Sequence, residues 1–129
     1  MSGFLDTSMV VRYLTGDVPV LAQRASAVMD GEDELLITGE VVAEAGYMLT
    51  TAYQLPRELV VEHLSALLRK RNLTPYGLDK GLVLQGLLLC RGHVSFTDAM
   101  VWAAAKSAGT DVVYTLEDGF PDDGIEVRK

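Results

Sequence analysis

The sequence predicts an α/β protein, a three-layer α/β/α sandwich with a mainly parallel central sheet. Short runs rich in β-branched and aromatic residues alternate along the chain with longer segments of helical periodicity. Strands separated by helices pair in parallel through right-handed crossovers, and helices then cover both faces of the sheet. The 129 residues contain no repeat, low-complexity tract or Ser/Gly-rich linker, so we expect residues 1–129 to form a single domain.

The N-terminal half alternates between strand and helix signals. "GFLD" is a short apolar run that ends in an acid, and "TSMVVRYLTGD" has a helical pattern that Gly16 closes. Pro19 is tolerated in the first turn of a second helix. "ELLIT" predicts a strand, after which Thr38 is suited to cap a helix that reaches about Tyr53.

The C-terminal half continues the alternation. Pro56 begins the helical "PRELVVEHLSALLRKR", whose basic C-terminal end suits the helix dipole. "NLTPYG" is a weak strand, and Asp79 starts a leucine-rich helix that ends near Gly92. The next helix follows Asp98 and stops at Gly109. "DVVYT" predicts a strong strand, and "GIEV" predicts a last strand at the edge of the sheet.

Composition restricts the classes of protein to which the chain can belong. Hydrophobic residues make up 49% and charged residues 22%, which is typical of a globular domain rather than a disordered one. No apolar run has the length of a membrane helix, no secretory signal begins the chain, and Cys90 is the only cysteine. We therefore expect a cytoplasmic protein with no membrane partner. The net charge of -7 weakens a nucleic-acid hypothesis, although part of that charge could belong to a cation site.

Four acids occupy positions that favour a functional site. Asp6 ends the first predicted strand and Glu117 lies just past "DVVYT", and ligands of α/β sheets bind beyond the carboxyl ends of strands. Glu44 falls on or beside the apolar stripe of its helix, and Asp98 precedes the apolar face of another. The stripe beside Glu44 consists of Val41, Ala45, Met48 and Ala52. Carboxylates are seldom buried unless they are paired or bound to metal. Folding would bring all four acids to one cleft.

Each acid also has a structural interpretation. Asp6 is placed to cap a helix, although Thr7 or Ser8 could cap it equally well. Glu44 could reach water from the edge of its stripe, and Asp98 could complete a capping box with the serine three residues before it. Glu117 could belong to a plain acidic turn. It is the convergence of the four that favours a site.

Four carboxylates in one cleft require a counter-charge. Two like charges 4 Å apart repel by roughly 4 kcal/mol at an effective dielectric constant near 20. Either the pKa values of the acids rise or a divalent cation binds among them. Ligation by oxygen alone selects Mg²⁺ or Mn²⁺ over zinc, and His63 and His93 are isolated from every acid. Such a site suits phosphodiester chemistry.

Four segments, in this order, resemble those of PIN-domain ribonucleases, specifically the VapC-type toxins of toxin–antitoxin pairs. They are "FLDTSMVVRYLTGD", "ITGEVVAEAGYML", "VSFTDAMVWAAAKSAG" and "VVYTLEDGF". The resemblance implies a PIN-like fold in which Asp6 and Asp98 are the main metal ligands, and Glu44 and Glu117 complete the site and orient the attacking water. The family usually has Asp where this chain has Glu117.

The resemblance also implies supporting residues and partners. Asp118 could replace Glu117 as a ligand, and Ser8 and Thr115 would support the site through hydrogen bonds. Arg12 could contact a substrate phosphate, or it could lie on a solvated helix face. The resemblance implies an RNA substrate, Mg²⁺ (or Mn²⁺), a VapB-like antitoxin that blocks the site, and a homodimer.

Two other functions compete with this endoribonuclease hypothesis. The first is a catalytically silent binding module that keeps the PIN fold and receives a basic partner in its acidic cleft. The charge of -7 and the presence of Glu117 favour this alternative modestly. The second is a phosphohydrolase of the aspartyl-phosphate kind. Its Asp-x-Asp opening is absent, because Asp6 is followed by Thr7 and Ser8.

Overall fold

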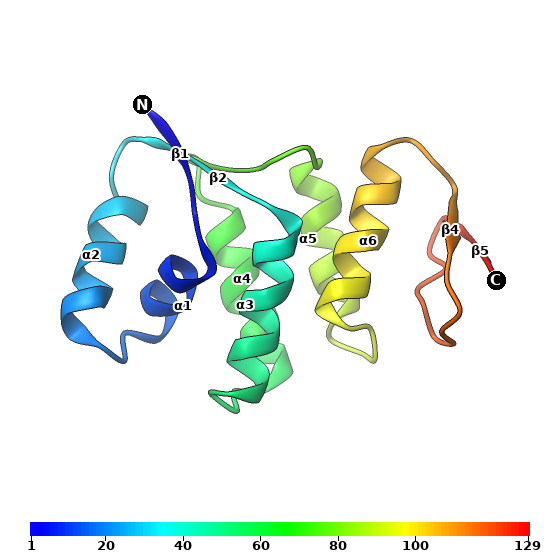
Figure 1. Ribbon diagram of the computed structural model, residues 1–129, viewed down its shortest axis with the longest axis horizontal. Helices are drawn as coiled ribbons and strands as arrows, with labels where there is room; N and C mark the ends of the chain where they lie inside the picture. Colours follow the sequence, from blue (N-terminus) through cyan, green and yellow to red (C-terminus); the bar gives the residue numbers. More distant parts are fainter.

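Three short parallel strands form the larger of two sheets. The computed structural model describes residues 1–129, and its arrangement is drawn in Figure 1. Strands β1 (Ser2–Phe4), β2 (Glu34–Ile37) and β3 (Leu73–Pro75) pair in parallel in the order β1-β2-β3. Helical segments separate them in sequence, so the predicted α/β class with parallel pairing is confirmed.

Six helices surround and connect the strands. They are α1 (Thr7–Thr15), α2 (Pro19–Met29), α3 (Gly39–Thr51), α4 (Arg57–Leu68), α5 (Lys80–Leu89) and α6 (Phe96–Ser107). Several helix boundaries follow from local chemistry that the sequence predicted. Gly16 ends α1 in the left-handed conformation, with φ 64°, which glycine adopts without a Cβ penalty. Thr38 accepts a hydrogen bond from the Val41 N–H at 3.1 Å, and the Asp79 carboxylate accepts one from the Leu82 N–H at 3.0 Å.

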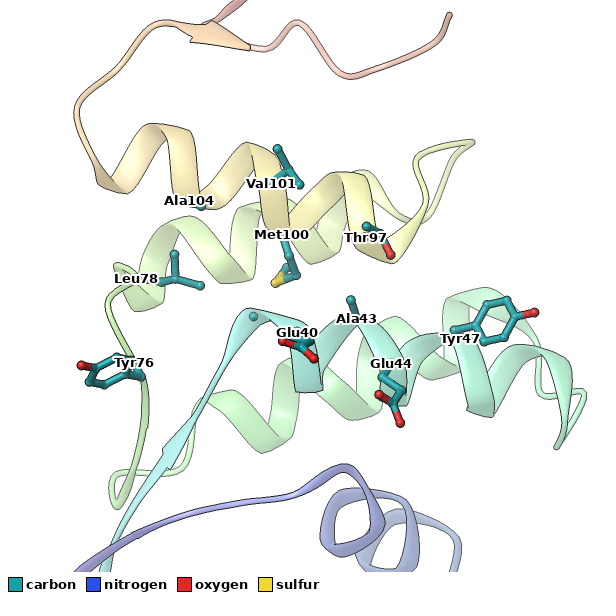
Figure 2. Close-up of a pocket in the computed structure, with 11 residues that line it drawn as sticks. Glu40, Ala43, Glu44, Tyr47, Tyr76, Leu78, Thr97, Met100, Val101 and Ala104 are labelled. Carbon is teal, nitrogen blue, oxygen red and sulfur yellow. The ribbon is translucent and has the colours of Figure 1, made fainter. Parts of the chain in front are cut away.

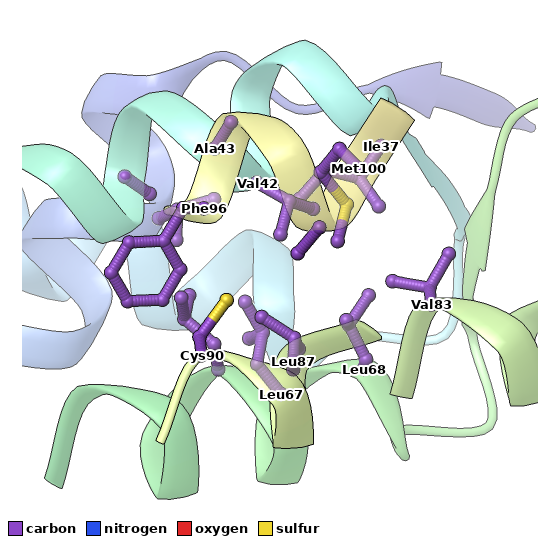
Figure 3. Packing of buried hydrophobic residues seen from close by; sticks show 14 of the residues in the cluster. Ile37, Val42, Ala43, Leu67, Leu68, Val83, Leu87, Cys90, Phe96 and Met100 are labelled. Carbon is purple, nitrogen blue, oxygen red and sulfur yellow. The ribbon is translucent and has the colours of Figure 1, made fainter. Parts of the chain in front are cut away.

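One hydrophobic cluster joins the helices to the larger sheet. Figure 3 shows part of it, with Ile37 of β2 and Val42 of α3 packed among side chains of α4, α5 and α6. Helices α3 and α6 approach each other closely, since a Cβ added at Gly46 would lie 2.5 Å from the Phe96 ring. Cys90 is fully buried in the same cluster, where its thiol packs as a small hydrophobic residue.

The last two strands form a separate sheet. Strands β4 (Val112–Tyr114) and β5 (Glu126–Arg128) pair in parallel with each other and with no other strand. Figure 1 shows them at one end of the molecule's longest axis, on the far side of α6 from β1 and β2. The strands predicted to share one central sheet are thus divided between two sheets. None of the helices combines the length and the apolar composition that crossing a bilayer requires.

The β4–β5 sheet is held to the body of the molecule by α6. The indole Nε1–H of Trp102 donates a hydrogen bond to the Asp123 carbonyl at 2.9 Å. Val113 and Ile125 are buried in the same hydrophobic cluster as Trp102. We call residues 112–128 the C-terminal arm.

Candidate functional site

Asp6 lies in the link between β1 and α1, with an exposed side chain. It is the N-cap residue of α1, yet its carboxylate accepts no capping hydrogen bond from the helix. The Ser8 hydroxyl donates a hydrogen bond to Asp6 Oδ2 at 3.1 Å. The backbone of Asp6 therefore begins the helix while its carboxylate stays available for a ligand. The Ser8 contact is of the kind that the resemblance implied.

Glu44 lies on α3 and is exposed. The predicted stripe placed it on or beside the buried face, but the residues that α3 buries are Val42, Ala43, Ala45, Gly46 and Leu49. Figure 2 shows its carboxylate directed away from α6, on the other side of α3. Helix α1 packs against α3, so Glu44 and the start of α1 belong to the same region of the molecule.

Asp98 is half-buried in the first turn of α6. The helix begins at Phe96, three residues earlier than expected, because Ser95 is its N-cap. The Asp98 N–H donates a hydrogen bond to Ser95 Oγ at 3.0 Å, which is the first half of the capping box. This bond uses the backbone of Asp98 and leaves its carboxylate oxygens free.

Glu117 and Asp118 lie in the exposed turn after β4. The Glu117 N–H donates a hydrogen bond to Thr115 Oγ1 at 3.1 Å, so Thr115 shapes this turn. The Asp118 carboxylate forms an ion pair with the Lys129 ammonium group. Of these two acids, Glu117 has the unpaired side chain.

The structure does not bring the four acids together. No group of three or more His, Cys, Asp or Glu side chains lies close enough to hold a metal ion. Part of the reason lies in the sheets: because β4 does not pair with β1, Glu117 does not reach the edge at which β1 ends. A single chain in this arrangement does not fit the Mg²⁺ set that was predicted from Asp6, Glu44, Asp98 and Glu117.

Arg12 is engaged by a neighbouring acid. Its Nη1 lies 2.8 Å from Asp17 Oδ2, and the Tyr53 hydroxyl donates to the same carboxylate oxygen at 2.7 Å. The hydrogen bonds from Tyr53, Thr15 and Arg12 hold the pKa of Asp17 well below its usual range, and the pKa of Arg12 is raised in turn. A substrate phosphate would have to compete with Asp17 for the guanidinium group.

A groove that the sequence did not reveal lies between α3 and α6. It has a volume of about 590 Å³, and Glu40 and Glu44 are its only charged lining residues. Figure 2 shows apolar side chains such as Leu78 and Met100 between the two helices. The sequence signal that could have found it is the run of small residues on facing helices, Gly39, Ala43 and Ala104.

Comparison with known families identifies the fold. The sequence profile of the PIN domain matches residues 3–123, which contain all four acids. The chain belongs to the PIN domain family. PIN domains are in general metal-dependent nucleases, so the family places the chain among nucleases. No curated protein sequence matches the chain significantly.

Proposed function

We propose that this PIN-domain protein is a Mg²⁺-dependent endoribonuclease of the VapC type, a toxin that a VapB-like antitoxin neutralises in the cytoplasm. The proposal rests on the position of Asp6 in the fold and on the availability of its carboxylate. Asp6 lies two residues after β1 and inside the PIN match, and its carboxylate accepts no hydrogen bond from the backbone of α1. Ligand sites of parallel α/β sheets lie beyond strand ends of this kind.

The proposed roles divide between binding and orientation. Asp6 and Asp98 would hold the cation, while Glu44 and Glu117 would complete the set and orient water, once these four acids, which the structure holds apart, are brought together. When bound, a divalent cation makes its water a better nucleophile and stabilises charge on the phosphate oxygens. The carboxylates of Asp6, Glu44 and Glu117 are exposed, so they are accessible to a cation and to substrate. Glu117 has a longer side chain than the usual Asp, and Asp118 is already paired with Lys129.

Hydrolysis of total RNA tests the proposal. We expect cleavage with Mg²⁺ or Mn²⁺, none with a chelator, and a loss of about 100-fold or more in Asp6→Asn or Asp98→Asn protein, the scale expected when a charge-stabilising group is removed. Cleavage at the wild-type rate in either variant would exclude this mechanism.

Glu40 and Glu44 provide a matched pair for the same assay. They lie one turn apart on α3 and both are exposed. Glu44→Gln should lower the cleavage rate, whereas Glu40→Gln should leave it unchanged. Equal effects of the two substitutions would show that only the general negative charge of this surface matters.

A catalytically silent binding module is the second candidate. It is favoured by the groove between α3 and α6, whose lining is apolar apart from two carboxylates and three other polar groups. An apolar groove with acids at its margin suits an amphipathic segment that carries basic residues. Calorimetry distinguishes the two functions. Equal loss of antitoxin affinity in Glu40→Gln and Glu44→Gln protein, together with no RNA cleavage, would favour the binding module.

A further inference from the structure

The groove between α3 and α6 is open because small residues face each other across it. On α3, Gly39, Ala43 and Tyr47 follow one another at intervals of four residues, so they lie on one face of the helix. On α6 the lining includes Ala104 and the exposed Val101. The volume of about 590 Å³ falls within the range of pockets that bind small ligands. The groove is therefore large enough to hold an organic ring system.

Exposed tyrosines stand at the two ends of this groove. Figure 2 shows Tyr76 and Tyr47 at opposite ends of the lining, with Leu78 and Met100 between them. The Tyr76 ring already makes an edge contact with Phe4, with the ring centroids 5.3 Å apart. The Tyr47 side chain is 65% exposed, and no aromatic ring packs against it. Tyr47 therefore offers a free aromatic face to a ligand in the groove.

The Tyr47 end of the groove adjoins proposed catalytic residues. Glu44 lines the groove one turn before Tyr47 on α3, and Thr97 lines it directly before Asp98 on α6. The two helices also pack closely at this end. A group that binds at Tyr47 therefore lies beside two of the four acids.

The charges of the groove select the part of a nucleotide that can enter it. Glu40 and Glu44 are the only charged lining residues, and both repel a phosphate group. A nucleobase carries no charge, and its flat faces stack on aromatic side chains. The groove is thus suited to a base, and the phosphates attached to that base need a separate contact.

A basic loop beside the start of α6 can provide that contact. Arg57 donates hydrogen bonds to the carbonyls of Cys90 (3.1 Å) and Val94 (2.8 Å), so it holds both ends of the loop between α5 and α6. Arg91 lies between these two anchored positions, is exposed and forms no ion pair. Residues 80–97 contain no acid, although the chain as a whole carries a net charge of -7. This loop is therefore a local site for a phosphate group.

We propose that the groove between α3 and α6 binds an unpaired base of the RNA, stacked on Tyr47, while Arg91 binds a neighbouring phosphate. The inference rests on the proposed function, because it places one nucleotide beside acids that would act on the chain. A base inside a duplex is stacked between its neighbours and does not offer a free face to Tyr47. Every base has such faces, so the contact selects an unpaired base and not a particular sequence.

Binding of a fluorescein-labelled single-stranded RNA, with a chelator present to prevent cleavage, tests the base site. Tyr47→Ala should weaken binding by about 5- to 150-fold, the range for loss of one stacked base. Tyr47→Phe should retain the wild-type affinity, because the ring stacks and the hydroxyl does not. Tyr114→Ala is the control, since Tyr114 is 73% exposed in the C-terminal arm, outside the groove. Equal affinities of the Tyr47→Ala and Tyr114→Ala proteins would overturn the base site.

An abasic position in the RNA separates stacking from a general effect of the substitution. Removing the base that occupies the groove should weaken binding to the wild type. The same removal should have no further effect on binding to Tyr47→Ala protein, because the two changes remove one contact. Losses that simply add at every position of the RNA would overturn the proposal.

Salt dependence tests the phosphate contact. Arg91→Ala should reduce the slope of log affinity against log salt concentration by about 0.7, the contribution of one phosphate contact in a single strand. Arg24→Ala removes the same charge from an exposed position on α2 and should leave the slope unchanged. The wild-type slope in Arg91→Ala protein would overturn the role of Arg91.

Three results separate this inference from the proposed function. RNA binding that depends on Tyr47, without cleavage, would refute the nuclease and support the base site. Cleavage whose KM is unchanged in Tyr47→Ala protein would support the nuclease and overturn the base site. Binding of a basic amphipathic peptide that depends on Tyr47 and Glu40, with no effect of Tyr47→Ala on RNA binding, would assign the groove to a protein partner and also overturn the proposal.

Discussion

Gly46→Ala tests the contact that sets the distance between α3 and α6. These helices carry Glu44 and Asp98, so their spacing also positions two proposed site residues. A Cβ at position 46 would meet three atoms of the Phe96 ring at 2.5, 2.6 and 2.8 Å. Ordinary van der Waals contact begins near 3.4 Å. The ring or one of the helices must therefore move by about 0.9 Å to restore ordinary contact.

Two opposing effects determine the expected change in stability. Overpacking of a core of this kind costs about 1–3 kcal/mol. Alanine in place of a helical glycine stabilises the helix by up to about 1 kcal/mol. We expect the free energy of unfolding to fall by about 1–2 kcal/mol, since the cost of overpacking exceeds the gain in helix propensity. The melting temperature should fall by about 3–8 °C for a chain of this size.

Chemical denaturation followed by circular dichroism measures this change. Gly81→Ala is the control, because Gly81 is exposed near the start of α5 and a Cβ there meets only the Asp79 carboxylate, at 3.1 Å. That variant should be at least as stable as the wild type. The cost of Gly46→Ala should also shrink in a Phe96→Leu background. Wild-type stability of Gly46→Ala protein, or an equal cost in both backgrounds, would refute the steric reasoning.

Three further predictions concern other buried or anchoring groups. Arg57 donates hydrogen bonds to the carbonyls of Cys90 (3.1 Å) and Val94 (2.8 Å). In urea denaturation, Arg57→Ala should therefore lower the free energy of unfolding by about 1–3 kcal/mol, and Arg57→Lys should recover part of this loss. Ser65 has a buried hydroxyl with no hydrogen-bond partner. Ser65→Ala should therefore leave the free energy of unfolding unchanged or raise it by about 1 kcal/mol in the same assay, and a marked loss of stability would contradict this. Burial raises the pKa of the Cys90 thiol from 9.0 to about 12, so the native thiol should resist alkylation at pH 8 until the protein unfolds. The unfolded chain releases that proton first, so stability should decline between pH 9 and about 12, and Cys90→Ala should reduce the decline.

The local boundaries of the fold could be predicted from sequence because a few neighbouring residues determine them. Gly16, Thr38 and Asp79 act through their own backbone conformation or through hydrogen bonds to residues three positions away. The start of α6 was placed three residues late, because Ser95 and Asp98 share one capping box and either could mark the beginning. Such an error arises where two nearby residues are both suited to cap a helix.

The orientation of α3 was harder to predict. The sequence placed the apolar stripe along Val41 and Met48, but both are half-buried, and Val42 and Leu49 are the residues that are fully buried. Helices α1, α4 and α6 all pack against α3. A helix with neighbours on several sides loses the single polar face that fixes the phase of its hydrophobic pattern. The exposure of Glu44 follows from that tertiary packing.

By itself, the sequence determined the α/β alternation, most of the helix ends and the order in which the four acids occur. These depend on periodicity and on contacts between residues close together in the chain. Only the tertiary structure decided that β4 and β5 stand apart from β1, and hence that Glu117 is separated from Asp6. Strand edges interact through backbone groups that every residue except proline possesses in full, so the side-chain pattern does not specify which edges meet.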